Sequence, residues 1–100
     1  MPTFHARAAP FLPTMSLATA QVAATRRAAA RGHAMGAWRG EKGEWCSTCD
    51  RCGQSLELAV GALSAAGVAA VRAQNGVAGE MEGVVVYVLG GALEACHVDV

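Results

Sequence analysis

Small apolar residues recur at helical spacing through an alanine-rich stretch from Ser16 to Arg31. Alanine is the best helix former, Ser16 can cap the N-terminus, and Gly32 suits the position that follows the C-terminus. The apolar stripe consists of Leu17, Ala20, Ala24 and Ala28. We therefore expect a helix that packs closely against a second layer through small side chains.

A period of two, which is typical of a half-buried strand, appears after the middle of the chain. Within residues 55–60, the side chains of Leu56, Leu58 and Val60 fall on one face, and more polar or smaller side chains fall on the other. Residues 82–89 are rich in β-branched valine, so they predict a second strand.

Shorter patterns predict the rest of a sheet. Residues 34–38 and 44–48 are expected to form two strands around a glycine-containing turn at 39–43. Residues 92–98 are expected to form a last short strand after a Gly-Gly turn. These strands would lie next to one another in an antiparallel sheet.

Two segments give weaker signals. Residues 61–79 are rich in Ala, Gly and Val, so either a helix at 63–73 or a strand at 68–73 fits, and we expect the least order there. Three prolines predict an irregular tail at residues 1–15. The predicted fold is therefore one small α+β domain, residues 16–100, with an N-terminal helix packed on a short antiparallel sheet.

The composition indicates that this core is thin. Hydrophobic residues make up 53% of the 100 residues, but 22 of them are alanine and none is isoleucine. Alanine buries little apolar area, and small domains with thin cores usually need a metal or disulfides. Four cysteines and three histidines could supply such a staple.

A C-x2-C-Gly motif at Cys49, Cys52 and Gly53 favours a metal. Two thiolates at this spacing can hold one tetrahedral Zn²⁺, and the glycine permits the left-handed turn beneath it. Two more ligands are required, and we expect them to be His33 and Cys96. The set would form a closed Cys₃His site of the structural type, so the metal would staple the predicted domain.

Other readings of these residues stay open. His97 could replace Cys96, since adjacent residues of a strand face opposite ways. His33 could instead lie beside the helix C-terminus and interact with its dipole. The cysteines could also form a disulfide or a redox dithiol, or remain buried without a ligand.

Cys46 extends the motif to C-x2-C-x2-C, a spacing found in iron–sulfur proteins. Those proteins usually continue with a nearby Cys-Pro, whereas here the fourth cysteine is remote. If the chain is extended from 44 to 49, Cys46 and Cys49 are an odd number of residues apart and face opposite sides of the sheet. We therefore expect Cys46 to point away from the metal.

Charge is distributed unevenly along a chain of zero net charge. Residues 1–40 carry five arginines and no acid, whereas residues 41–100 carry three basic and eight acidic residues. This asymmetry predicts two electrostatic faces or a basic arm that could contact an anion such as nucleic acid. The candidate nucleic-acid contacts are Arg26, Arg27, Arg31, Arg39 and Arg51. Trp38 and Trp45 are expected in the core, with a base-stacking platform as the alternative.

Several functions find no support in the pattern. No apolar run is long enough to span a bilayer, and the N-terminus lacks the apolar segment of a secretory signal. We expect a cytoplasmic location, although the acid-free first 39 residues also resemble an organelle transit peptide. No catalytic triad, phosphate loop or carboxylate pair is visible, so no enzyme activity and no small-molecule substrate are expected.

The motifs together resemble a known type of protein. Gly32-His33, Met35-Gly36, Trp38, the C-x2-C-Gly motif and the late Cys96 are similar to small zinc-ribbon-like proteins of actinobacteria and their phages. The resemblance covers roughly residues 22–60 and Cys96. It implies His33, Cys49, Cys52 and Cys96 as zinc ligands, and it implies no activity.

The function expected from the sequence is that of a small module with a structural Zn²⁺, which contacts nucleic acid, or a protein bound to nucleic acid, through its basic helix. A protein-interaction adaptor without nucleic-acid contact is the first alternative. A redox or iron–sulfur protein is the second.

Overall fold

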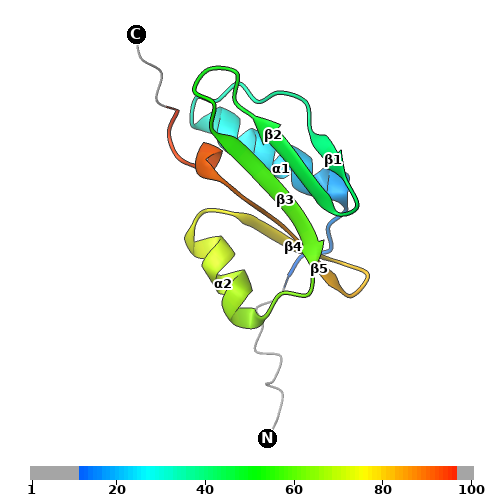
Figure 1. The fold of residues 1–100 in the computed structure, drawn as a ribbon. Helices are drawn as coiled ribbons and strands as arrows, with labels where there is room; N and C mark the ends of the chain where they lie inside the picture. Colours follow the sequence, from blue (N-terminus) through cyan, green and yellow to red (C-terminus); the bar gives the residue numbers. More distant parts are fainter. Residues whose placement is uncertain (1–11, 97–100) are drawn as a thin grey trace, which may run out of the picture.

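The computed structural model describes residues 12–96, which form two α-helices and a five-stranded antiparallel sheet (Figure 1). In chain order the elements are α1 (Leu17–Ala30), β1 (Arg39–Glu41), β2 (Glu44–Thr48), β3 (Ser55–Gly61), α2 (Ala65–Ala73), β4 (Val77–Met81), β5 (Val84–Leu89) and a 3-10 turn, η2 (Gly91–Leu93). The strands lie in the order β1-β2-β3-β5-β4. The predicted α+β class is confirmed, with a larger sheet and a second helix.

Two elements agree closely with the sequence prediction. The α1 helix begins after Ser16, whose hydroxyl accepts a hydrogen bond from the Thr19 amide, and its buried face is the alanine stripe. The β3 strand alternates as expected, because Leu56 and Leu58 are buried while Glu57 is exposed. In both elements, the residues that the apolar repeat placed on one face are the residues found buried, except for the partly buried Leu17 and Val60.

The first hairpin lies further along the chain than predicted. Residues 34–38 are not a strand, and only Met35 makes an isolated bridge, with Cys49. The strand that pairs with β2 is β1, and the turn is the two-residue Lys42-Gly43, with φ of 53° and 84°. Two residues in the left-handed region are typical of a tight hairpin turn, so this turn fixes the register.

Of the two alternatives left open for residues 61–79, the helix is confirmed, because α2 spans Ala65–Ala73 and Ser64 caps it by accepting from the Gly67 amide. The first residues of β4 also lie in this range, and that strand was not predicted. The strand predicted at residues 92–98 is wrong. Residues 92–96 are not a strand, because η2 turns the chain there toward the C-terminus of α1. Residues 97 and 98 lie outside the described part of the chain.

The described fold begins before Ser16. The Met15 amide donates to the Glu80 carbonyl (2.9 Å), and the Glu80 amide donates to the Pro13 carbonyl (2.8 Å). Thr14 thus pairs in parallel with Glu80 and covers the outer edge of β4. Most of the tail predicted at 1–15 lies outside the described residues. Within residues 12–96, neither helix has the length and apolar character needed to cross a bilayer.

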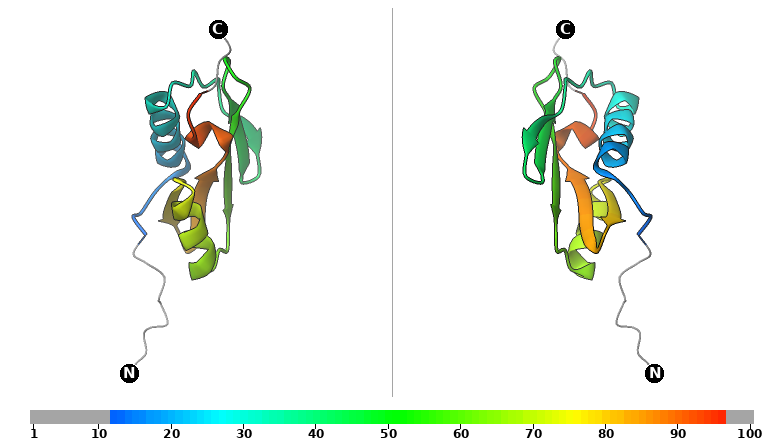
Figure 2. Two further views of the ribbon diagram at one scale, coloured as in Figure 1. Left: turned by 90° about the vertical axis from the view of Figure 1, so that its left-hand side faces the viewer. Right: turned by 90° about the vertical axis from the view of Figure 1, so that its right-hand side faces the viewer.

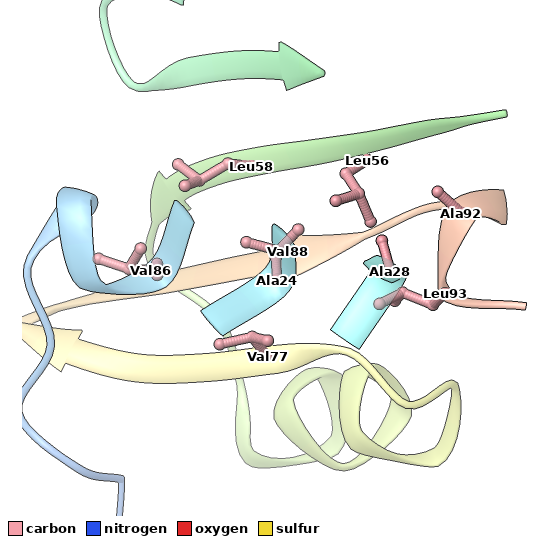
Figure 3. Close-up of a cluster of buried hydrophobic side chains, with 10 residues drawn as sticks. Ala24, Ala28, Leu56, Leu58, Val77, Val86, Val88, Ala92 and Leu93 are labelled. Carbon is pink, nitrogen blue, oxygen red and sulfur yellow. The ribbon is translucent and has the colours of Figure 1, made fainter. Parts of the chain in front are cut away.

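The main core lies between α1 and one face of the sheet (Figures 2 and 3). Leu56 and Leu58 of β3 face the valines of β5 and the alanines of α1. Its buried members are Ala20, Ala24, Ala28, Leu56, Leu58, Val77, Val86, Val88, Ala92 and Leu93. Trp38 and Trp45 pack against this cluster, which confirms their predicted core role. The short alanine side chains let the helix lie close to the sheet.

A smaller cluster occupies the opposite face. Val68 and Val71 of α2 pack with Ala78 of β4, and Val85, Tyr87 and Leu89 of β5 contact them. Successive residues of a strand face opposite sides of the sheet. The buried valines of β5 therefore pack against α1, and the residues between them pack against α2. The α2 helix packs on β4 and β5 and leaves the other side of β1–β3 uncovered.

Gly90 allows the close packing that sends the chain from β5 into η2. It has φ of 145°, and a Cβ there would overlap the Ser55 carbonyl oxygen and lie 2.9 Å from Leu56 Cα. We expect Gly90→Ala to lower the free energy of unfolding by about 3 kcal/mol, because strain and overlap add. Gly61→Ala, with no atom within 4 Å of the new Cβ, should change it little. Denaturant unfolding of both variants tests this, and equal effects would contradict the packing described.

Candidate metal centre

His33 is positioned by the way α1 ends. The Gly32 amide donates to the Ala29 carbonyl (3.0 Å), and the His33 amide donates to the Ala28 carbonyl (3.1 Å), which together form a Schellman motif. Gly32 has the left-handed φ of 92° that this motif requires. The chain therefore turns back under the helix, and the His33 side chain is buried, with 5% of its surface exposed.

The Cys49–Gly53 turn is held next to His33 by backbone pairing. The Asp50 amide donates to the Ala34 carbonyl (2.8 Å), and the Gly36 amide donates to the Thr48 carbonyl (2.9 Å). Within the turn, the Gly53 amide donates to the Cys49 carbonyl (3.1 Å), and the Arg51 amide donates to Cys49 Sγ (3.3 Å). This arrangement confirms the turn expected beneath a C-x2-C pair.

Cys96 reaches the same place from the other end of the chain. After η2, in which Leu93 is buried in the main core, the Cys96 amide donates to the Arg31 carbonyl (2.9 Å). The Cβ of Cys96 lies 3.5 Å from the place where a Cβ on Gly32 would stand. The last described segment is thus anchored across the C-terminus of α1.

Four side chains converge as a result. The ligand atoms of His33, Cys49, Cys52 and Cys96 all lie within 4.8 Å of one another. Cys49 Sγ and Cys96 Sγ are 3.9 Å apart, and Cys52 Sγ is 3.4 Å from His33 Nδ1. His33 and Cys49 are buried, and the other two are half-buried. This cluster of one imidazole and three thiols could hold a metal ion.

The hydrogen bonds of His33 show which nitrogen faces the cluster. Its Nε2 lies 2.6 Å from the Glu94 carbonyl oxygen. A carbonyl can only accept, so Nε2 carries the proton and donates it. Nδ1 is then left with a free lone pair, and it is the nitrogen that faces Cys52. Metal-binding histidines are usually held in this way by an outer acceptor, which orients the ring and fixes the tautomer.

The thiols are electrostatically coupled. Burial raises the pKa of Cys49, but hydrogen bonds from the backbone amides of Cys52, Arg51 and Ala34 oppose it, and the pKa is lowered to about 5. Burial raises the pKa of Cys96 to about 11, and hydrogen bonding and charge repulsion from Cys52 and Cys49 act in the same direction. In such a group, one thiolate raises the pKa of the next thiol by charge repulsion. A cation at the centre would offset this repulsion and favour the deprotonated form of all the thiols.

Cys46 lies apart from this group, as the sequence predicted. It is exposed on β2, whereas Ser47 is buried on the other face. The three cysteines of the C-x2-C-x2-C spacing therefore do not converge. His97, the alternative to Cys96, lies outside the described residues.

The five arginines proposed for nucleic acid are not all on one surface. Arg26, Arg27 and Arg31 lie on or next to α1, and Arg51 donates to the Gly32 carbonyl (3.3 Å) near the end of the same helix. Arg27 donates to the Asn75 carbonyl (2.9 Å) and the Gly76 carbonyl (3.1 Å), so it also anchors the turn before β4. Arg39 lies on β1, beside Glu41 and opposite Cys46.

The sequence did not point to the carbonyl of Glu94 or to the anchoring bonds of Arg27 and Arg51. A backbone carbonyl can accept a hydrogen bond whatever its side chain is, so the sequence does not reveal which carbonyls do so. These contacts depend on the Schellman motif at the end of α1 and on the path of the chain after η2.

Comparison with protein-family models, with curated proteins and with solved structures finds no match to this chain.

Metal binding at pH 7 is expected to release protons. Cys49, with a pKa of about 5, is already a thiolate at this pH, whereas Cys96, with a pKa of about 11, must lose its proton to bind. Affinity should therefore rise with pH, and Cys96 alone should contribute about one proton per metal ion. Calorimetry in buffers of different ionisation enthalpy counts the protons. Cys96→Ser should lower that count, and a count of zero for the unaltered chain would contradict the proposed ligation.

Proposed function

We propose that the chain is a small module stapled by one structural Zn²⁺, bound by His33 Nδ1 and by the sulfurs of Cys49, Cys52 and Cys96. The spacing of the four donors carries this proposal. Zinc bonds of about 2.3 Å to sulfur and about 2.0 Å to nitrogen place tetrahedral ligands about 3.8 Å (S–S) and about 3.5 Å (S–N) apart. The distances of 3.9 Å and 3.4 Å in the cluster lie close to both values.

The donor chemistry also supports zinc. Three thiolates and one imidazole form a soft, closed set, which suits Zn²⁺ and disfavours Mg²⁺ or Ca²⁺. All four coordination positions come from the protein, so no position is left open for a substrate. The site would join the end of α1, the 49–53 turn and the segment after η2, three regions far apart in the sequence.

We further propose that two exposed arginines, Arg26 in the C-terminal half of α1 and Arg31 at its C-cap, contact nucleic acid near the metal centre. Arg26 and Arg31 are exposed, and neither side chain bonds to another described residue. Arg51 is held close to the end of the same helix through Gly32. The α1 helix itself contains no acidic residue, so no negative charge within the helix would repel a phosphate backbone.

Fluorescence anisotropy with labelled duplex DNA and single-stranded RNA tests the nucleic-acid contact. Arg26→Gln and Arg31→Gln should each weaken binding and reduce the slope of log K against log salt by about 0.7–0.9. Arg39→Gln is the matched control, because Arg39 lies on the side of the sheet that α1 does not cover, and it should bind as the unaltered chain does. No binding at low salt would exclude this function and favour an adaptor that binds only protein.

A further inference from the structure

Cys96 contacts both other sulfurs of the cluster. Its Sγ lies 3.9 Å from Cys49 Sγ, and its thiol also forms a hydrogen bond with Cys52. Cys52 in turn faces His33, with 3.4 Å between Sγ and Nδ1. Cys49 and Cys96 are therefore a pair of sulfurs in contact, and they come from two segments that lie 47 residues apart in the chain.

A covalent bond within this pair requires only a short movement. The sulfurs of a disulfide are about 2.05 Å apart, so the pair must close by about 1.9 Å. Cys49 is held in its turn, because the Arg51 amide donates to its sulfur (3.3 Å) and the neighbouring Asp50 amide donates to the Ala34 carbonyl (2.8 Å). Cys96 is half-buried and lies outside every helix and strand, so its side chain can rotate toward Cys49.

The two sulfurs differ in their access to solvent. Cys49 has 2% of its surface exposed, whereas Cys96 is half-buried. A dissolved oxidant therefore reaches Cys96 first, and the buried sulfur of Cys49 lies behind it. Redox-sensitive cysteines often combine an accessible sulfur with a second sulfur that resolves the first oxidation product. Cys49 and Cys96 have this arrangement.

We propose that a hydroperoxide converts Cys49 and Cys96 into a disulfide, and that this bond replaces the metal as the staple of the domain. The accompanying loss of zinc rests on the proposed metal-binding function, because the reaction consumes two of the four ligands. Formation of the disulfide does not itself require zinc. The cluster then has a reduced state, which binds zinc, and an oxidised state, which does not.

The reaction transfers two electrons from the two thiols to the peroxide. The oxygen–oxygen bond of the hydroperoxide breaks, Cys96 takes one oxygen as a sulfenic acid, and an alcohol leaves, or water in the case of hydrogen peroxide. Cys49 then attacks the Cys96 sulfur, the sulfur–oxygen bond breaks, and the hydroxyl leaves as water with the proton of the Cys49 thiol. In the zinc-bound chain both sulfurs are thiolates, so two protons come from solvent and Zn²⁺ is released.

The disulfide joins two of the regions that zinc would join. It links the 49–53 turn to the segment after η2, over a separation of 47 residues. A cross-link stabilises a domain mainly by restricting its unfolded chain, and a loop of about 50 residues should raise the thermal midpoint by about 15–30 °C. This shift is similar to the one expected for the metal, so the domain should stay folded in both states.

Tryptic mapping shows which sulfurs join, because Arg51 separates Cys49 from Cys52. The three cysteines of the cluster fall in three tryptic peptides, which in chain order are 43–51, 52–72 and 73–100. The Cys46→Ser variant is used, since Cys46 is exposed and shares the first peptide with Cys49. The metal-free, reduced chain is treated with equimolar hydrogen peroxide, and the remaining thiols are alkylated before digestion.

We expect the main product to be a cross-link between peptides 43–51 and 73–100, with peptide 52–72 alkylated. A further Cys96→Ser change should abolish this cross-link, and Cys52→Ser should leave it in place. A main cross-link that includes peptide 52–72, or oxidised sulfurs without any cross-link, would overturn the proposal.

Thermal unfolding shows whether the disulfide takes over from the metal. The oxidised, metal-free chain should melt about 15–30 °C above the reduced, metal-free chain, and a reductant should remove the difference. Equal midpoints for the two forms would contradict a stapling role for the disulfide.

Zinc release distinguishes this inference from the proposed metal-binding function. In the zinc-loaded chain, hydrogen peroxide should transfer one zinc ion to a chromophoric chelator for each disulfide formed, and reduction with added zinc should restore binding. A chain that binds no zinc would contradict the metal-binding function, while the peptide map of the metal-free chain would still decide whether the disulfide forms. A chain that binds zinc but forms no cross-link between Cys49 and Cys96 would overturn the disulfide alone.

Discussion

Cys49→Ser is expected to abolish stoichiometric zinc binding. Cys49 is the most buried of the three cysteines in the cluster, with 2% of its surface exposed, and the Arg51 amide already points at its sulfur. Loss of an outer hydrogen-bonding partner alone costs about 10–100-fold in metal affinity, so loss of a thiolate ligand should cost more than about 100-fold. Competition with a chromophoric zinc chelator measures the affinity directly.

Cys46→Ser is the matched control for this experiment. It makes the same chemical change three residues away, on the exposed side of β2, and should leave zinc affinity unchanged. If Cys46→Ser weakened binding as much as Cys49→Ser did, Cys46 would be a ligand and the assigned cluster would be wrong.

Removal of the metal is expected to lower the thermal midpoint sharply. A ligand present at about 1,000 times its dissociation constant stabilises the native state by about 4 kcal/mol. At about 4–8 °C per kcal/mol for a domain of this size, chelation should lower the midpoint by about 15–30 °C. Calorimetry or circular dichroism before and after chelation measures the shift, and added zinc should restore it.

Hydrogen exchange shows where that stability lies. Without metal, the amides around His33, the 49–53 turn and the segment ending at Cys96 should exchange fastest. The amides of β3 and β5 should stay protected longest, because Leu56, Leu58, Val86 and Val88 form the main core independently of the metal. Uniform loss of protection would indicate that the core cannot persist alone, and an unchanged thermal midpoint would contradict a structural role for the metal.

The parts of the fold that the sequence predicted are those with a strong local signal. The α1 helix has an alanine stripe, a serine cap and a glycine after its end, and each local preference agrees with the packing observed. In β3, Leu56 and Leu58 alternate with polar residues, so only one face could be buried. The separation of Cys46 from the cluster of His33, Cys49, Cys52 and Cys96 followed from the same alternation.

The parts that could not be predicted depend on contacts between distant segments. Ala, Gly and Val in residues 61–79 fit a helix or a strand equally well, and burial of Val68 and Val71 against β4 and β5 accompanies the helix. The strand predicted at 92–98 failed because Gly90 brings the backbone against Ser55, and η2 then turns the chain toward α1.

The candidate site shows the same division. The C-x2-C pair is local, and its spacing alone indicated a metal. His33 and Cys96 were proposed as the missing ligands, and the structure places both at the cluster. The tautomer of His33 depends on the Glu94 carbonyl, 61 residues away, and no property of the Glu94 side chain indicates that contact.

Native mass spectrometry of the reduced chain, combined with elemental analysis, tests the central claim most directly. The account predicts a mass that corresponds to one zinc ion per chain, which disappears with chelator and in Cys49→Ser but persists in Cys46→Ser. A chain purified under reducing conditions that takes up no metal when equimolar zinc is added would contradict the account.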